Sequence, residues 1–134
     1  MPQARKAAFH GVSLIQPESV TAHAPIKFTV SHQVGGGYDS TTGIYTAPYS
    51  GFYTFHTRLF PKSAATFFLD LYQNAYLVSR FLCQDENSRF TCSSSVTIHV
   101  SAGDRVWMQA DDYNGACYNA TFDNVFSAVL VLPD

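Results

Sequence analysis

Alternating apolar and polar residues are the dominant pattern along this chain. In SVTIHV (95–100), valine and isoleucine alternate with threonine and histidine, and TFFLDLYQ (66–73) and GFYTFHTRLF (51–60) repeat the same two-residue period. This period is typical of strands that bury one face. RVWMQA (105–110) and VFSAVLVL (125–132) add two strands, and the latter is so continuously apolar that we expect both of its faces to be covered.

Turn-forming residues separate these strands, and no window shows a sustained 3.6-residue period. Many short strands with frequent turns predict an all-β protein, either an antiparallel sandwich or a jelly roll. The turn segments are GGG (35–37), STTG (40–43), PYSG (48–51), DENS (85–88), SAGD (101–104) and DDYNG (111–115).

The length and composition of the chain favour one domain with a substantial core, because 134 residues suit a single domain. Charged residues make up only 13% of the chain and aromatic residues 15%, so the polar cover is thin for a soluble monomer. A buried subunit interface would account for this composition. The net charge of −2 and the absence of a Lys/Arg run argue against nucleic acid as a partner.

The chain shows no sign of membrane insertion, since no apolar stretch approaches the roughly 18 residues that a spanning helix needs. The segment MPQARKAAFHG at the start lacks the apolar centre of a signal peptide. The sequence start is therefore compatible with a cytosolic protein and with a secreted protein from which a targeting segment has been removed.

A longer segment, YDSTTGIYTAPYSGFYTF (38–55), resembles the signature region of the globular-head family of complement component C1q. That region has a Tyr-Asp pair, a Thr-Gly turn, an aromatic residue, a proline and then Gly-x-Tyr-x-Phe. AGDRVWMQ (102–109) and FSAVLVLPD (126–134) resemble later strands of the family, so the resemblance spans the chain. Tyr45 stands where the family commonly has Phe. The matching positions are Tyr38, Asp39, Thr42, Gly43, Tyr45, Pro48, Gly51, Tyr53 and Phe55.

The resemblance implies an all-β, ten-stranded antiparallel jelly-roll sandwich of the C1q and tumour necrosis factor type. It implies a single domain over residues 1–134, with 1–7 as an N-terminal tail, that assembles as a tight homotrimer. Under this interpretation the 38–55 segment is scaffold, with Tyr53 and Phe55 in the core. The function must then be sought in loops.

The three cysteines bear on the compartment of the protein. Cys83 and Cys92 bracket QDENSRFT (84–91) between two strands, so a disulfide is one prediction. Three reduced, buried thiols in a cytosolic protein are the alternative. If Cys83 and Cys92 pair, Cys117 is left free or joins two copies of the chain. Asn119 opens the sequon NAT (119–121) and is a candidate glycosylation site in a secreted protein.

Two polar loops offer the chemistry of sugar recognition. Aromatic faces suit the C–H surfaces of sugars, while amides, carboxylates and arginine suit hydroxyl and acidic groups. The alternative interpretation of both loops is ordinary surface polarity. The candidate ligand-binding residues are Asp111, Asp112, Tyr113, Asn114 and Tyr118 in one loop, and Asp85, Glu86 and Arg89 in the other.

The sequence requires no cofactor. The acids of 111–119 do not follow an EF-hand pattern, but Ca²⁺ in this loop stays an option because some family members bind it. The five histidines are scattered, and none is spaced as a zinc pair.

The resemblance and the two loops together predict a secreted, extracellular, lectin-like recognition module in innate immunity. Its expected ligands are carbohydrates, including sialylated or microbial glycans and cell-surface glycoconjugates. The alternative is a C1q/TNF-like ligand or scaffold that engages a cell-surface protein receptor. We expect no enzyme, since the chain has no Gly-x-Ser-x-Gly, no His-Glu-x-x-His and no phosphate-binding glycine loop.

Overall fold

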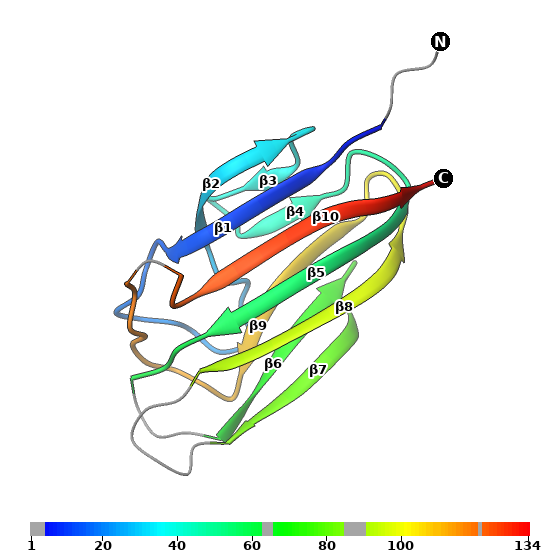
Figure 1. The fold of residues 1–134 in the computed structure, drawn as a ribbon. Coiled ribbons are helices and arrows are strands. Elements are labelled where there is room, and N and C mark those ends of the chain that lie inside the picture. The colour runs from blue at the N-terminus through cyan, green and yellow to red at the C-terminus, as the bar shows by residue number, and fades with distance from the viewer. Residues whose placement is uncertain (1–4, 63–65, 85–90, 121) are drawn as a thin grey trace.

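The computed structural model describes residues 5–62, 66–84, 91–120 and 122–134. Over these residues the chain forms ten strands and no helix, arranged in two antiparallel sheets of five strands each (Figure 1). The strands are β1 (Ala8–Leu14), β2 (Phe28–Val34), β3 (Tyr38–Asp39), β4 (Ile44–Thr46), β5 (Gly51–Leu59), β6 (Thr66–Gln73), β7 (Tyr76–Gln84), β8 (Cys92–Val100), β9 (Arg105–Asp111) and β10 (Val125–Pro133).

The strand order is that of the predicted jelly roll. Sheet 1 runs β2-β1-β10-β5-β8 and sheet 2 runs β3-β4-β9-β6-β7. Most strands that pair within a sheet are distant in sequence. For example, β1 pairs with β10. The start of β1 and the end of β10 lie at one end of the sandwich, and the loop between β1 and β2 and the loop between β9 and β10 gather at the other (Figure 1).

Aromatic side chains fill the space between the sheets, and the predicted alternation is confirmed. Tyr53 and Phe55 on β5 are fully buried, while Phe52 and His56 point to the outer face. Fully burying such large apolar side chains contributes roughly 1.5–3 kcal/mol each. The largest fully buried aromatic residues are Phe28, Tyr45, Tyr53, Phe55, Phe67 and Phe126.

The 38–55 segment consists of turns and strands that support this core. Gly43 adopts a left-handed conformation with φ of 79°, which glycine tolerates best. A Cβ atom at Gly51 would collide with the backbone carbonyl of Leu132 in the neighbouring strand. Tyr38 accepts a hydrogen bond at its hydroxyl from the Phe28 amide, 2.9 Å away. The segment therefore builds the sandwich.

The expectation that both faces of 125–132 are covered is wrong for this chain. On β10 Phe126 and Ala128 are buried in the core and Leu130 packs against it, whereas Val129, Val131 and Leu132 are 40%, 47% and 64% exposed. The strand lies in the middle of sheet 1, so both of its edges are paired. Among the described residues no further layer covers the outer face of that sheet, which leaves apolar side chains of a single copy at the surface.

Candidate functional site

The 111–119 loop, expected to bind ligand, is joined closely to the loop between β1 and β2. Val20 and Gly115 exchange backbone hydrogen bonds of 2.7 and 3.0 Å, and the Cys117 amide donates to the Pro17 carbonyl at 2.7 Å. The two loops meet at the end of the sandwich opposite the start of β1 and the end of β10 (Figure 1). They form one surface, which sequence spacing alone does not reveal.

Three asparagines hold this surface together. The Asn114 side-chain oxygen accepts a hydrogen bond from the Ala22 amide at 2.9 Å. Asn119 accepts from the Leu14 amide at 2.9 Å and donates its Nδ2 atom to the Leu14 carbonyl at 3.1 Å. Asn124 is fully buried, and its side-chain oxygen accepts from the Phe60 amide at 2.8 Å. The expected glycosylation atom of Asn119 is therefore engaged with β1.

The two tyrosines expected to stack on sugars have different environments. Tyr113 is only 3% exposed, its ring lies 5.2 Å from that of Phe67, and its hydroxyl donates to the Ala116 carbonyl. Tyr118 packs against Phe60 with ring centroids 4.6 Å apart. The Lys62 ammonium lies 5.6 Å from the centre of the same ring. Only Tyr118 thus has a ring near the surface.

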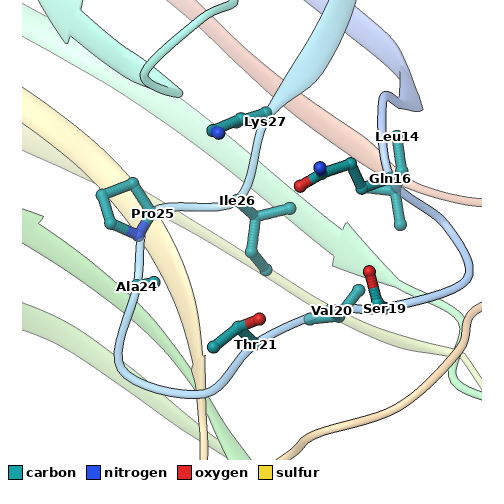
Figure 2. A pocket seen from close by; sticks show the side chains of 9 residues that line it. All are labelled: Leu14, Gln16, Ser19, Val20, Thr21, Ala24, Pro25, Ile26 and Lys27. Carbon is teal, nitrogen blue, oxygen red and sulfur yellow. The ribbon is translucent and has the colours of Figure 1, made fainter.

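A small hollow of about 180 Å³ opens beneath the β1–β2 loop. Figure 2 shows side chains of mixed character around it, and the apolar ones are Leu14, Val20, Ala24, Pro25 and Ile26. The polar lining groups are the Gln16 amide, the Ser19 and Thr21 hydroxyls and the Lys27 ammonium. Thr21 precedes Ala22, whose amide is bound by Asn114. The hollow therefore adjoins the 111–119 loop.

Asp111 belongs to a buried polar network on the outer face of sheet 2. Its side chain is only 4% exposed, and it accepts hydrogen bonds from the Tyr72 hydroxyl at 2.7 Å and from Gln109 at 2.9 Å. His23 of the β1–β2 loop brings its Nδ1 atom to 2.9 Å from the Asp111 carboxylate. The second carboxylate of the network is Asp70, which Arg80 contacts with two nitrogens. Asp111 thus has a structural role, because it links sheet 2 to the β1–β2 loop.

The pKa values of the two carboxyl groups in this network are shifted in opposite directions. Burial raises the pKa of Asp70, and the nearby Asp111 adds to the rise while Arg80 opposes it. Burial also acts to raise the pKa of Asp111, but hydrogen bonds from Asp70, Tyr72 and Gln109 outweigh it and hold that pKa below its usual range. Each of these two carboxyl groups therefore contributes to the pKa shift of the other.

Sequence inspection missed the partners of Asp111. Asp70 at the centre of the predicted strand 66–73 was the available signal, because a carboxylate there needs water or a partner. For His23 the sequence holds no such signal, because His23 lies in a loop far from Asp111 along the chain. Its backbone is in the left-handed region, with a φ of 63°. Its neighbour Asp112 is exposed, and its carboxylate lies 3.7 Å from the His23 Nε2 atom. Asp85, Glu86, Arg89 and Thr121 of the sequon lie outside the described residues.

The predicted disulfide is present between Cys83 and Cys92, and it joins the edge strands β7 and β8. Cys117 is free and only 1% exposed. Burial raises the pKa of its thiol to about 12. This thiol is therefore protonated and hidden, which does not suit a bond to another copy of the chain.

In the described part of the chain, no group of three or more His, Cys, Asp or Glu side chains is placed to hold a metal ion. The described residues also contain no helix long and apolar enough to cross a membrane.

Comparison with known proteins agrees with this fold. Residues 8–131 match the model of the C1q domain. The chain is 34% identical to a complement C1q subunit of Rattus norvegicus over 101 residues, which cover 74% of this chain and 40% of that protein. For the Mus musculus protein of the same name the identity is 31% over 114 residues, covering 84% and 46%. The chain thus spans less than half the length of these relatives.

Solved structures show the same fold at lower sequence identity. The globular domain of zebrafish complement 1qA protein superposes with a TM-score of 0.80 at 19% identity, covering 96% of this chain and 99% of that one. Murine APRIL gives a TM-score of 0.76 at 11% identity, covering 95% and 100%. The family match over most of the chain and the jelly-roll topology lead to one conclusion: this chain belongs to the C1q domain family.

Proposed function

We propose that this protein is a non-catalytic, secreted, homotrimeric recognition module that binds carbohydrate in innate immune recognition. Membership of the C1q domain family supports a recognition role, and the relatives are named as complement C1q subunits. The disulfide between Cys83 and Cys92 supports an extracellular location, because such bonds persist mainly in oxidising compartments.

The observation that carries the proposal is the hollow beside the 111–119 loop. It combines the Thr21 hydroxyl, the Gln16 amide and the Lys27 ammonium with the apolar surface of Ile26. Sugar hydroxyls need such directional polar groups, while the C–H face of a sugar ring needs an apolar surface. Asp112 and Asn114 would extend the site along the neighbouring loop. At about 180 Å³ the hollow suits one monosaccharide rather than a long oligosaccharide.

Weak binding at one small site would be strengthened by three copies. The outer face of sheet 1 exposes apolar side chains where the start of β5 pairs with the end of β10. They are Phe52, Val129, Val131 and Leu132. Exposed apolar patches of this kind favour association between subunits. A trimer would present three hollows, and simultaneous binding can raise the overall affinity by a factor of about 10² or more.

A glycan array on the purified protein, after light scattering has established its oligomeric state, tests the proposal. We expect a trimer that binds a subset of glycans, and Thr21→Val to lower that signal because it removes one hydroxyl at nearly constant volume. Thr29→Val, which changes an exposed threonine on β2, is the matched control. A trimer with no glycan signal at high density, or equal losses in both variants, would contradict carbohydrate binding in this hollow.

A protein receptor is the second candidate, and the edge strand β7 favours it. Its side chains Tyr76, Leu77, Phe81 and Leu82 are 76%, 44%, 46% and 46% exposed. Exposed apolar side chains on both faces of an edge strand suit contact with another protein. If the trimer is silent on glycans, a receptor screen in which Tyr76→Asp abolishes capture would support this alternative.

A further inference from the structure

Two aromatic side chains stand next to each other on the outer face of sheet 2, where β6 and β9 run side by side (Figure 1). Tyr72 on β6 is directly opposite Trp107 on β9, and both are partly exposed. Their chain neighbours Leu71 and Met108 are buried in the core, so the alternation of a strand turns the two rings outward. The ring centroids are 5.9 Å apart and the ring planes make an angle of 9°. We call this pair the aromatic patch.

Buried hydrogen bonds hold both rings of the aromatic patch in place. The Tyr72 hydroxyl donates to Oδ2 of Asp111 at 2.7 Å. The Trp107 indole nitrogen donates to the Gln109 side-chain oxygen at 2.7 Å, and Gln109 in turn donates to Oδ1 of Asp111 at 2.9 Å. Both rings are thus tied to one carboxylate. Because their polar tips are already paired, a ligand would meet the carbon surfaces of two rings whose orientation is fixed in advance, which lowers the entropy cost of binding.

Polar groups lie beside the aromatic patch on the same face of the sheet. Arg105 is two residues before Trp107 on β9 and therefore points outward as well. Thr46 on β4 is directly opposite Arg105, and both of these side chains are exposed. Diagonal neighbours across a strand pair are roughly 7–8 Å apart, which places the Thr46 hydroxyl within reach of a small ligand that rests on Trp107. The rings, a hydroxyl and a guanidinium thus share one region of the surface.

The surroundings of the aromatic patch favour a small polar ligand over a protein segment. Both β6 and β9 are paired on either side, so no free strand edge is available here for an added peptide strand. Exposed polar side chains, Thr46 and Arg105, border the rings directly, whereas the centre of a protein interface is depleted in charge. A sugar ring combines an apolar C–H face with hydroxyl groups at its edge, which matches this arrangement.

We infer that the aromatic patch binds a sugar ring, whose C–H face packs on Trp107 and Tyr72. The Arg105 guanidinium donates hydrogen bonds to the sugar hydroxyls, and the Thr46 hydroxyl donates or accepts one. This inference rests on the proposal that the protein binds carbohydrate, but it uses none of the residues around the β1–β2 hollow. The patch also lies on the other sheet from the face through which we propose that copies associate.

Trp107 itself provides a direct test, because it is the single tryptophan of the chain. The methyl glycosides of galactose, mannose and N-acetylglucosamine would be titrated into the wild-type protein while tryptophan fluorescence is recorded. We expect at least one of them to change the emission saturably and to protect Trp107 from quenching by iodide, since a stacked sugar ring covers the indole. Sorbitol, which has hydroxyl groups but no ring, is the control for the effect of added solute. A response no larger than that of sorbitol for all three glycosides would overturn the inference.

Substitutions at the border of the patch locate the bound sugar. Thr46→Val should weaken binding by about 3- to 10-fold, because it removes one hydrogen bond at nearly constant volume. Thr66→Val makes the same change at an exposed threonine at the other end of β6 and should keep the wild-type affinity. Trp107→Leu should abolish the binding heat in calorimetry while the circular dichroism spectrum stays unchanged. Equal losses in the two threonine variants would overturn the site.

The aromatic patch and the β1–β2 hollow can fail separately. If glycans bind on the array, Thr21→Val abolishes that signal and Trp107 stays unprotected, the patch is excluded and the hollow remains. If Trp107 is protected and Thr21→Val has no effect, the patch is supported and the hollow is excluded. If no saccharide gives a signal by either method, carbohydrate binding as a whole is excluded, and the patch with it.

Discussion

Arg80 contacts Asp70 through two parallel hydrogen bonds, Nε to Oδ1 at 2.9 Å and Nη2 to Oδ2 at 2.7 Å, directly across the β6–β7 pair. The Asp70 side chain has no exposed surface, while that of Arg80 is 42% exposed. The guanidinium also lies 4.2 Å from the centre of the Phe68 ring. One arginine thus covers a carboxylate that water does not reach.

We expect Arg80→Met to destabilise the protein, because it leaves the buried Asp70 carboxyl without its partner. Urea unfolding should show a lower midpoint than in Arg105→Met, which removes an exposed arginine from the same sheet. The double variant Asp70→Asn/Arg80→Met should recover part of the loss. Equal midpoints for the two single variants would show that the pair contributes nothing specific.

Asp104 should make stability depend on acid pH. Hydrogen bonds from Asn74, the Ser101 amide and Gln73 hold the pKa of its carboxyl below the usual range. A carboxyl with a depressed folded pKa stabilises above its unfolded pKa, and this stabilisation is lost as the pH falls through the folded value. Asp104→Asn should cost about 1 kcal/mol at pH 7. The difference from wild type should shrink between about pH 5 and pH 2, and a constant difference in urea titrations would contradict the prediction.

Replacing both Cys83 and Cys92 by alanine should lower the free energy of unfolding by about 2.7 kcal/mol, the chain-entropy value for a loop of roughly ten residues. Urea unfolding of the double variant measures the change. Reductant should destabilise the wild type and leave the variant unaffected. A variant as stable as the wild type would mean that β7 and β8 hold the loop closed without the bond.

Tyr45 offers a stabilising substitution. Its hydroxyl is buried and has no hydrogen-bond partner within the described residues. A buried polar group without a partner costs free energy, which replacement by an apolar group recovers. Tyr45→Phe should therefore be neutral or stabilise the protein by up to about 1 kcal/mol. A marked fall in the melting temperature would show that the hydroxyl has a partner, such as an ordered water.

The proposed trimer can be tested at β10. Val131 is 47% exposed on the outer face of sheet 1, and an aspartate there would place a charge in the proposed contact. Light scattering should report a lower mass for Val131→Asp, with an unchanged circular dichroism spectrum. Tyr76→Asp on the edge strand β7 is the control that should keep the wild-type mass. If both variants remain trimeric, the contact must lie elsewhere.

The sequence by itself determined the fold class and most of the core. The two-residue period places Tyr53 with Phe55 on one face of their strand, and Phe67, Leu69 and Leu71 on one face of theirs, because side-chain direction in a strand follows local geometry. Both sets are buried in the structure. The disulfide was also predictable, since Cys83 and Cys92 end one strand and begin the next. These features depend on neighbours along the chain.

Only the tertiary structure decided which strands lie together, and with them the chemistry of each surface. The β10 sequence indicates a strand covered on both faces, but sheet 1 leaves its outer face open. The position of Asp111 indicates a loop ligand, but Asp70, Tyr72 and His23 arrive from other elements and enclose it. Such long-range pairing leaves no local pattern in the sequence.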